Sequence, residues 1–498
     1  MKSRVESIRH SLVLGILISL FLIYSPALAV LTWNGTTDNA WTTATNWAGG
    51  VAPAGALGDS LAFGAGDVGD RTVTTANGAY TTISGISFAG AAGAYSIAGT
   101  GSFSFDAGST ITGNGGYTHN LNTIGIVTTG AGVTFAGSDS YTVGGVISGT
   151  SITQLSSGTL TLSGTNTYNG GTTLSAGTIV LGNDSALGTG ALSVTNSSTI
   201  QSNDNSRSLS NAIGVAAAKT LTVSGTNNMT LGGVISGAGR LAKSGSSTLT
   251  LTGTNTYAGA TLSGGTGTIV VGNNSALGSG IFLVSSGGGA IQSNDDSRSL
   301  TNSILLLVGT NLTVSGSNNL TLGGVISSIG RLTKSGSSTL TLSRTNTYGG
   351  GTTLNAGTII LGANAALSTG MLTLGGNGTL QSNDDARLVS NLIATGGNTL
   401  TVSGASNLAL SGAISGTGAL TKSGAGTLTL SGTNTYTGTT TISAGTLKVS
   451  GGSAIANTGA VSLADVAGAV FELSSNETIG SLTGGGKGRK IYCYQTQD

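Results

Sequence analysis

The chain has little of the residues that cross-link exported proteins or carry out chemistry. Its 498 residues include one cysteine, two prolines and two histidines, and only 7% of them are charged. A single cysteine excludes a disulfide framework, so an oxidising destination must be tolerated without covalent cross-links. No serine–histidine–aspartate set and no His/Cys metal cluster can be assembled from this inventory. The sequence therefore predicts no catalytic residue, no metal site and no cofactor.

A concentrated basic surface is also missing. The chain has 18 basic and 17 acidic residues, and 15 basic and 16 acidic residues remain once the first 29 residues are set aside. Nucleic acids and anionic lipids both require clustered positive charge in a protein partner. Neither is predicted to bind.

Residues 1–29 are typical of a secretory signal peptide. Three basic residues precede the apolar run SLVLGILISLFLIY, and SPALA ends in small residues at Ala27 and Ala29. The alternative is an uncleaved membrane anchor, but the run is short for a bilayer span. We expect export by the Sec route and a mature chain that begins at Val30, which N-terminal sequencing of the purified protein would check.

The residues that are abundant favour β-structure. The chain has 87 glycines, and its leucine, isoleucine and valine residues alternate with threonine and serine. Disordered chains have fewer aliphatic residues and more charge or proline. Alternation with a period of two indicates strands with one buried face. Between these segments lie NGG, SGTN and SGAG, which are typical of tight turns.

One motif recurs at a nearly constant interval. The tyrosines of TNTY stand at Tyr168, Tyr257, Tyr348 and Tyr436, which are 89, 91 and 88 residues apart. GGVIS and QSND recur with a similar step. Self-similarity of this kind is the mark of a repeat architecture.

The fold class predicted from this period is all-β, a parallel β-helix (β-solenoid) rod built from repeats of about 89 residues. The period divides into four coils of roughly 22 residues, each pairing in parallel with the next. Leu160, Leu162, Ile179 and Leu181 are expected to point into the core. A β-sandwich array is the alternative, but no period has the long strands and single aromatic core of a sandwich module.

The predicted organisation has five parts. They are a signal peptide (1–29), an N-terminal cap with the first coils (30–140), a repeat solenoid with four copies (141–450), the last coils (451–486) and an irregular tail (487–498). All three tryptophans, Trp33, Trp41 and Trp47, lie in the cap region. We interpret them as the packing of a cap that covers the first coil. The alternative is a carbohydrate-stacking platform, which requires exposed indoles.

The repeat is specific enough to suggest a family. The segment LTKSGAGTLTLSGTNTYTGTTTISAGTLKVS, residues 420–450, closely resembles the autotransporter-associated β-strand repeat, also called the passenger-associated transport repeat. The resemblance implies a passenger region of a type V secreted protein, found outside the cell or on the outer membrane. It also implies that the repeats aid translocation and surface folding. The implied partners are the outer-membrane translocation machinery or a barrel domain, with an unidentified cell-surface or glycan ligand.

The C-terminal end departs from that family. Full autotransporters end in a membrane β-barrel, whereas here the repeat pattern stops near Gly486 and KGRKIYCYQTQD follows. We interpret this tail as a sign of a truncated or frameshifted gene. A chain without its barrel would remain in the periplasm.

Two polar features are candidate sites. His119, in YTHNLN, is interpreted as a surface turn residue because a catalytic base needs an oriented partner. The loops SNDNSR, SNDDSR and SNDDAR (202–207, 293–298 and 382–387) could bind calcium through oxygens, but each holds too few carboxylates. We interpret their Asn and Asp residues as turn formers whose charge Arg207, Arg298 and Arg387 balance.

A recurring lysine completes the set of candidate positions. Lys243, Lys334 and Lys422 are equivalent, but Gln154 takes that place in the first copy, so a required charge is not expected there. The function predicted is a non-enzymatic secreted or surface scaffold, with adhesion as one possible use. The alternative is a β-helical polysaccharide lyase or hydrolase, which needs a non-repeating cluster of acidic and basic residues. The sequence shows no such cluster.

Overall fold

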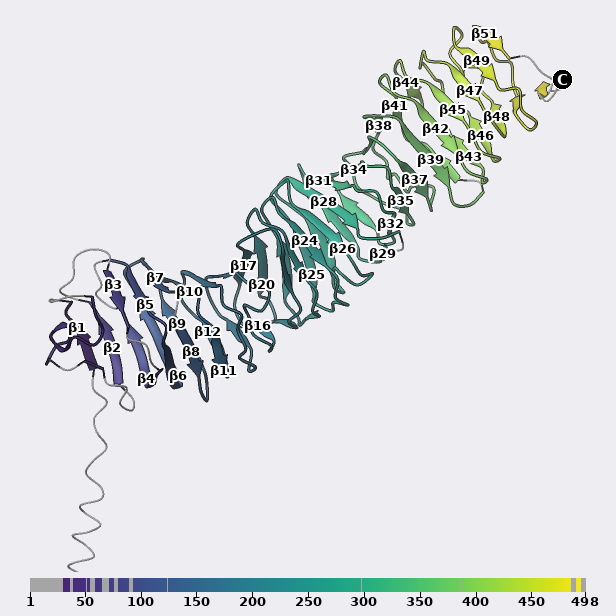
Figure 1. Cartoon of the computed structure of the whole chain (residues 1–498). Coiled ribbons are helices and arrows are strands. Elements are labelled where there is room, and N and C mark those ends of the chain that lie inside the picture. Colours follow the sequence, from purple (N-terminus) through teal and green to yellow (C-terminus); the bar gives the residue numbers. More distant parts are fainter. Residues whose placement is uncertain are drawn as a thin grey trace, which may run out of the picture. The chain divides into compact units, whose positions relative to one another are not determined.

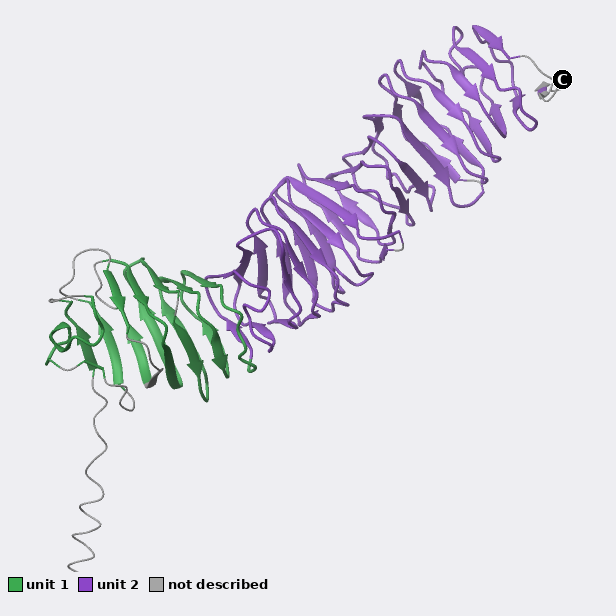
Figure 2. Cartoon of the chain, viewed as in Figure 1, with its two compact units in different colours: residues 1–170 green, residues 171–498 purple. Residues whose placement is uncertain are grey.

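The structure is a computed structural model. It describes residues 30–35, 39–50, 52–53, 59–64, 71–75, 79–88, 93–122, 124–296, 298–385, 387–484 and 490–493. The predicted signal peptide and part of the predicted tail lie outside these residues. The chain divides into two compact units, residues 1–170 and 171–498 (Figure 2).

The first unit consists of short parallel strands in two sheets (Figure 1). A single 3-10 turn, η1 (Ala44–Asn46), interrupts this pattern. One sheet has the order β1-β2-β4-β6-β9-β12, with β8 paired to β6 and β11 to β8: β1 (Val30–Trp33), β2 (Asp59–Phe63), β4 (Ala79–Ser87), β6 (Ser102–Gly113), β8 (Gly125–Thr128), β9 (Val133–Gly137), β11 (Ile147–Gly149) and β12 (Ile152–Gln154). The other has the order β3-β5-β7-β10-β13: β3 (Arg71–Thr74), β5 (Tyr95–Ala98), β7 (Thr118–Leu121), β10 (Ser140–Val143) and β13 (Thr159–Leu162).

In the described residues of the second unit, the paired strands are likewise short and parallel. Two runs of neighbouring parallel strands contain the first strands of this unit. One is β14 (Thr172–Leu174), β16 (Leu192–Val194), β19 (Ile213–Val215) and β22 (Ile235–Ser236). The other is β15 (Thr178–Leu181), β17 (Ser198–Ser202), β20 (Thr220–Ser224), β23 (Arg240–Lys243), β25 (Gly259–Leu262), β27 (Ile281–Val284), β30 (Ile304–Leu306) and β33 (Ile326–Ser328).

Three further sheets of the second unit begin later in the chain. The first is β18 (Arg207–Leu209), β21 (Met229–Leu231), β24 (Thr248–Leu251), β26 (Thr268–Val271), β28 (Gly288–Ser293), β31 (Asn311–Val314), β34 (Arg331–Lys334), β36 (Thr352–Leu354), β38 (Leu372–Leu374), β41 (Ile393–Ala394) and β44 (Ile414–Ser415). The second is β29 (Arg298–Leu300), β32 (Leu320–Leu322), β35 (Thr339–Leu342), β37 (Thr358–Leu361), β39 (Gly378–Ser382), β42 (Leu400–Ser403), β45 (Leu420–Lys422), β47 (Thr440–Ile442), β49 (Ala460–Leu463) and β51 (Ser481–Thr483). The third is β40 (Arg387–Val389), β43 (Leu408–Leu410), β46 (Thr427–Leu430), β48 (Thr446–Val449), β50 (Val470–Leu473) and β52 (Lys490–Cys493).

Each circuit of the chain, here called a coil, pairs in register with its neighbours. In the second unit, register partners are between 19 residues apart, as for Leu241 and Ala260, and 24, as for Leu447 and Phe471. Alternate side chains of each strand point inward, and aliphatic residues in adjacent coils stack on one another. Leu160, Leu162, Ile179 and Leu181 are fully buried, as predicted. The parallel β-solenoid expected from the sequence is confirmed.

The repeat period is not a whole number of coils. Four steps of register lead from Leu249 to Lys334, whereas the equivalent of Leu249 in the next copy is Leu340. The TLTL strands of successive copies, β24, β35 and β46, accordingly lie in three different sheets. Each copy therefore begins on a different face from the one before it.

Glycine is required where the chain turns tightly after the TK or AK dipeptide. Gly424, in KSG, has a φ of 85°, and a Cβ there would meet the Gly404 carbonyl oxygen at 2.5 Å. Gly245 and Gly336 have the same conformation in the other copies. Only glycine combines this φ with such a close approach of two coils.

The tail differs from the sequence-based prediction. Lys490–Cys493 form β52, whose backbone pairs in parallel register with β50. The irregular segment predicted for 487–498 is therefore wrong for these four residues. The physical reason is that the last coil exposes a row of unpaired backbone groups, and any extended segment can pair with such an edge.

Candidate functional site: side-chain bridges between coils

The asparagine of each TNTY motif is buried and bridges coils with its side chain. All four are at most 4% exposed. Each Oδ1 accepts a hydrogen bond from the backbone N–H of the GGVIS or GAIS isoleucine one coil earlier, at 2.7–2.8 Å: Asn166 from Ile147, Asn255 from Ile235, Asn346 from Ile326 and Asn434 from Ile414.

The amide nitrogen of the same side chain reaches the following coil. Nδ2 of Asn255 donates to the Ala276 carbonyl at 2.8 Å. Asn346 and Asn434 donate in the same way to the carbonyls of Ala366 and Ala454, at 2.7 and 2.6 Å. An uncharged amide supplies both a donor and an acceptor, which neither a carboxylate nor an apolar side chain does. The motif therefore joins three successive coils where regular strand pairing is interrupted.

The tyrosine that follows fills the core beside this bridge. Tyr168, Tyr257, Tyr348 and Tyr436 are at most 1% exposed. The Tyr257 hydroxyl donates to the Ala276 carbonyl at 3.1 Å. Asn255 and Tyr257 therefore donate to the same carbonyl oxygen of the next coil. Burial raises the pKa of Tyr436 to about 12, and it raises the pKa of the other buried tyrosines Tyr257 and Tyr348 further.

A second buried asparagine, after each of the three SNDxxR loops, donates its side-chain amide to the preceding coil. Asn211 donates to the carbonyls of Gly188 and Gly190, at 3.0 and 2.7 Å. Asn302 and Asn391 make the equivalent bonds in the next two copies. These residues were not singled out from the sequence, although an asparagine four residues after the arginine of each SNDxxR loop was a signal that could have found them.

The SNDxxR loops are turns closed by an arginine. Arg207 pairs with Asp204 and with Asn203, and Arg298 pairs with Asp295 and Asn294 in the same way. Hydrogen bonds from Ser206 are the main reason that the pKa of Asp204 lies below its ordinary value. Each loop thus uses its own cation to balance its carboxylate.

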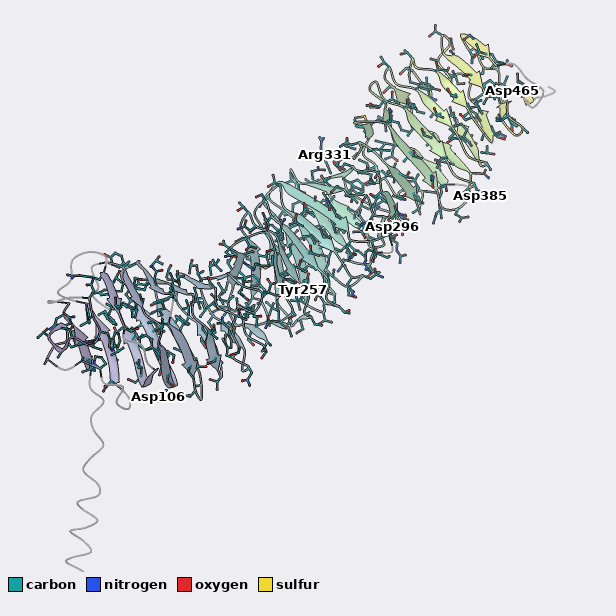
Figure 3. All side chains as sticks on the ribbon, in the orientation of Figure 1. Asp106, Tyr257, Asp296, Arg331, Asp385 and Asp465 are labelled. Atoms are coloured by element: carbon teal, nitrogen blue, oxygen red, sulfur yellow. The ribbon has the colours of Figure 1, made fainter. Side chains whose placement is uncertain are left out.

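These loops do not converge. Figure 3 labels Asp296 and Asp385, from the second and third loops, at separate places along the second unit. The described part of the chain holds no group of three or more His, Cys, Asp or Glu residues placed to hold a metal ion.

The outer residues of these loops also bridge coils. Oδ1 of Asn205, Asp296 and Asp385 accepts the backbone N–H of Asn228, Asn319 and Asn407, respectively, at 2.7–2.9 Å. The side chains of those three asparagines accept the N–H of the first threonine of β24, β35 and β46. The side chains of Asn205, Asp296 and Asp385 serve only as acceptors in these bonds, which explains why Asn and Asp interchange at this loop position.

The recurring lysine is buried, which the sequence did not predict. Lys243, Lys334 and Lys422 are at most 2% exposed, and each Nζ donates to backbone carbonyls of the KSG turn. Lys334 and Lys422 also reach the carbonyls of Ala356 and Ala444 in the next coil. Gln154 makes the same kind of contact, with the carbonyls of Ser156 and Gly158. The position therefore requires a donor rather than a charge.

This burial predicts that stability rises with pH. Desolvation lowers the pKa of Lys243, Lys334 and Lys422 to about 8, from 10.5. Between pH 8 and 10.5 the unfolded chain then binds more protons than the folded chain, so the free energy of unfolding increases. The contacts with backbone carbonyls favour the ammonium form and so oppose part of this effect. We therefore expect the free energy of unfolding to rise by about 1–2 kcal/mol per lysine.

Denaturant unfolding at pH 7.5 and 9.5 would measure this gain. The matched variant is the triple substitution of Lys243, Lys334 and Lys422 by Gln, the residue found in the first copy. We expect the variant to lose most of the rise in stability with pH. An equal rise in both proteins would contradict the assignment to these lysines.

His119 is not a surface residue, so that prediction is wrong. Both His119 and Asp139 are fully buried, and Nε2 of the imidazole lies 2.8 Å from the Asp139 carboxylate. The ring stacks on Phe88, with centroids 3.9 Å apart. The sequence did not reveal this because Asp139 lies one coil away, 20 residues along the chain. The pair has no access to solvent.

The three tryptophans are at most 2% exposed. Trp47 packs edge-to-face against both Trp33 and Trp41, with centroid distances of 5.1 and 5.0 Å. Its indole nitrogen donates to the Trp41 carbonyl at 2.8 Å. Buried indoles cannot stack on a sugar, so the arrangement agrees with the interpretation as packing at the first coils and not with a carbohydrate platform.

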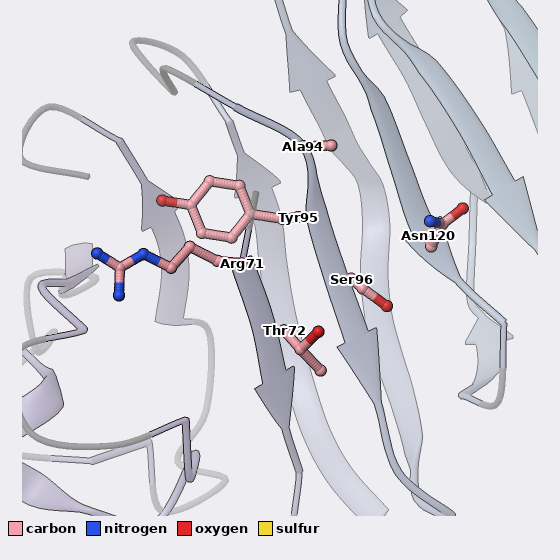
Figure 4. Close-up of a pocket in the computed structure, with 6 residues that line it drawn as sticks. All are labelled: Arg71, Thr72, Ala94, Tyr95, Ser96 and Asn120. Carbon is pink, nitrogen blue, oxygen red and sulfur yellow. The ribbon is translucent and has the colours of Figure 1, made fainter. Parts of the chain in front are cut away.

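A small pocket of about 150 Å³ lies on the first unit (Figure 4). Thr72, Ser96 and Asn120 line it from the neighbouring strands β3, β5 and β7, and they are register partners in turn. The guanidinium group of Arg71 points away from Asn120. The pocket brings together hydroxyl and amide groups but no acid–base pair.

Within the described residues, no helix has the length and apolar content needed to cross a membrane.

Comparison with known families agrees with this geometry. The passenger-associated-transport-repeat family matches residues 152–181, 241–266, 332–361 and 420–449. All four matched segments begin before the KSG-type turn. Three of them end with the second strand after TNTY, which is β15, β37 or β48, and the second segment ends in the turn after β25. No curated protein and no solved structure matched the chain. The chain therefore carries four copies of this repeat on a parallel β-solenoid.

Proposed function

We propose that this protein is a non-enzymatic, exported β-helical passenger whose repeats assist passage across an outer membrane and folding on the cell surface. The observation that carries the proposal is the coincidence of the four matched segments with the buried asparagine bridges. The most regular part of the sequence is the part that ties one coil of a repeat to both of its neighbours. The repeat is therefore a device for ordered stacking.

Such stacking suits transport of an unfolded chain. Coils of a solenoid contact mainly their neighbours, so folding can proceed coil by coil from any that has already formed. Asn255, Asn346 and Asn434 each have one bond in the coil before and one in the coil after, so an added coil completes the hydrogen bonds of the previous one. Folding outside the membrane would then oppose backward movement. The proposed partners are the outer-membrane translocation machinery or a barrel domain.

An adhesive use of the scaffold is compatible with the same proposal. A cell-surface or glycan ligand would meet strand faces rich in threonine and serine, because the indoles are buried. For the polysaccharide-processing alternative, no observation speaks in favour. The buried His119–Asp139 pair is closed to solvent, and the loop carboxylates are paired with arginines or accept backbone N–H groups.

Surface display tests the proposal. The full chain, joined at its C-terminus to an autotransporter barrel, is produced in a Gram-negative host, and intact cells are treated with protease. We expect processed chain that external protease can reach. A chain that stays inside intact cells with its leader attached would contradict the proposal.

A matched pair of variants links display to the repeat. Asn255→Asp disrupts a buried bridge, whereas Asn228→Asp keeps an acceptor at an exposed bridge. We expect several-fold less surface-exposed chain for Asn255→Asp and no change for Asn228→Asp. Equal display of the two would argue that the bridges have no part in translocation.

A further inference from the structure

The hydrogen bonds of His119 define its protonation state. Nδ1 accepts the backbone N–H of Tyr95 at 3.1 Å, so this nitrogen carries no proton. The proton of the neutral ring is therefore on Nε2, which donates to Asp139 Oδ2 at 2.8 Å. Both ring nitrogens are used, and the ring has no contact with water.

Asp139 is tied to several coils at once. Its Oδ1 accepts the backbone N–H groups of Gly116 and Tyr117, at 2.6 and 3.3 Å. Its backbone carbonyl accepts the hydroxyl of Ser156 at 2.6 Å. Through this pair, the coil that contains β5 is connected to the coils of β7 and β10 and to the segment before β13. The pair is a junction of the first unit.

A second proton on the ring does not fit this junction. With both nitrogens protonated, the new N–H at Nδ1 would point at the Tyr95 N–H, donor against donor. Within the described residues, the aromatic rings near the imidazole are those of Phe88, Tyr95 and Tyr141, and its carboxylate partner is Asp139. Arg71, the register partner of Tyr95, lies at the outward-facing pocket.

We propose that His119 and Asp139 form an acid-sensitive latch that holds the N-terminal coils closed at neutral pH and releases them in mild acid. Protonation breaks the bond to Tyr95, and β5 loses one of its ties to β7. The second unit has no histidine and stays folded. The latch thus confines the response to acid to one end of the chain.

The sign and size of the response follow from proton linkage. Burial lowers the pKa of His119. Below the ordinary value of 6.5 the opened form then binds a proton that the closed form does not, so stability falls as pH falls. One proton changes the opening equilibrium at most tenfold per pH unit, or about 30-fold between pH 7.5 and 5.

The imidazole can be observed directly. His119 is the only histidine after Val30, so the mature full chain with labelled histidine gives one set of ring signals by NMR. We expect the Nε2–H tautomer at pH 7.5 and no titration near 6.5 while the coils stay closed. A ring that titrates freely near 6.5, with no loss of structure, would overturn the proposal.

Hydrogen exchange followed by mass spectrometry tests the opening itself. Rates are corrected for intrinsic exchange at pH 7.5 and 5, and peptides from 93–122 are compared with peptides from 420–449. We expect up to 30-fold loss of protection at pH 5 in the first set only. His119→Gln should show equal protection at both pH values, even if it is less stable. Unchanged protection of the wild type at pH 5, or an equal acid response in the variant, would refute the latch.

Discussion

Leu430→Asp is expected to open the coils around β46 to protease. Leu430 is fully buried, between Leu410 in the coil before and Val449 in the coil after. A carboxylate placed there would lose its hydration and find no cation, at a cost of about 3–5 kcal/mol. Because coils contact mainly their neighbours, the first cleavages should fall close to residue 430.

Thr429→Asp is the matched control. Successive side chains of a strand point to opposite faces, and Thr429 is half-buried on the outer face, where Lys448 is its register partner. An aspartate there stays hydrated and lies beside a cation, so stability should change by less than about 0.5 kcal/mol. Limited proteolysis with mapping of the cut sites compares the two variants. Equal resistance of both would contradict the inward direction of Leu430, and cuts spread over all four repeats would contradict local coupling.

Asn255→Asp is expected to have the second-largest effect. The substitution replaces the amide nitrogen that donates to the Ala276 carbonyl with a second oxygen, so two acceptors would face each other. The new carboxylate would also be buried at a site that is 3% exposed. We expect the free energy of unfolding to fall by about 3 kcal/mol near neutral pH.

The same variant has a characteristic pH dependence. A protonated aspartic acid has an O–H donor and can restore the bond to the next coil. Its pKa in the folded chain would be raised, so the loss of stability should grow as pH rises from about 4 to 7.5. Denaturant unfolding at several pH values measures this slope.

Asn228→Asp controls for the change of charge. Asn228 is exposed and uses only its Oδ1, which accepts the Thr248 N–H at 2.7 Å. An aspartate keeps that acceptor, so we expect a change within about 0.5 kcal/mol. If both variants were equally destabilised, the bridge formed by Asn255 would not be the cause.

The sequence predicted the solenoid because its signals are local and repeated. Alternation in TLTL and turn residues in KSG are set by side chains within a few positions of one another, and repetition shows them four times. The inward direction of Leu160 and Ile179 followed from the same alternation. The sequence also excluded a disulfide framework, a metal cluster and a basic surface through counts alone.

The polar interior could not be predicted in the same way. A TNTY asparagine looks like a turn former in the sequence, yet its two partners lie about 20 residues before and after it. The lysine of KSG looked dispensable because Gln154 replaces it, whereas the structure shows that both serve as donors to turn carbonyls. Lysine and glutamine differ in charge but donate the same kind of hydrogen bond, so comparing their charges does not reveal the shared role.

By itself, the sequence determined that this chain forms stacked β coils with an aliphatic core. The alternation of aliphatic and polar residues is visible within each short segment, and the repeat of about 89 residues is visible when the copies are compared. Only the tertiary structure decided which polar side chains lie inside and what each one binds. The coil length of 19–24 residues does not divide the repeat evenly, so the faces of successive copies shift. The partners of His119, Asn255 and Lys334 depend on this register, because a hydrogen bond requires two atoms within about 3 Å, a distance that spacing along the chain does not specify.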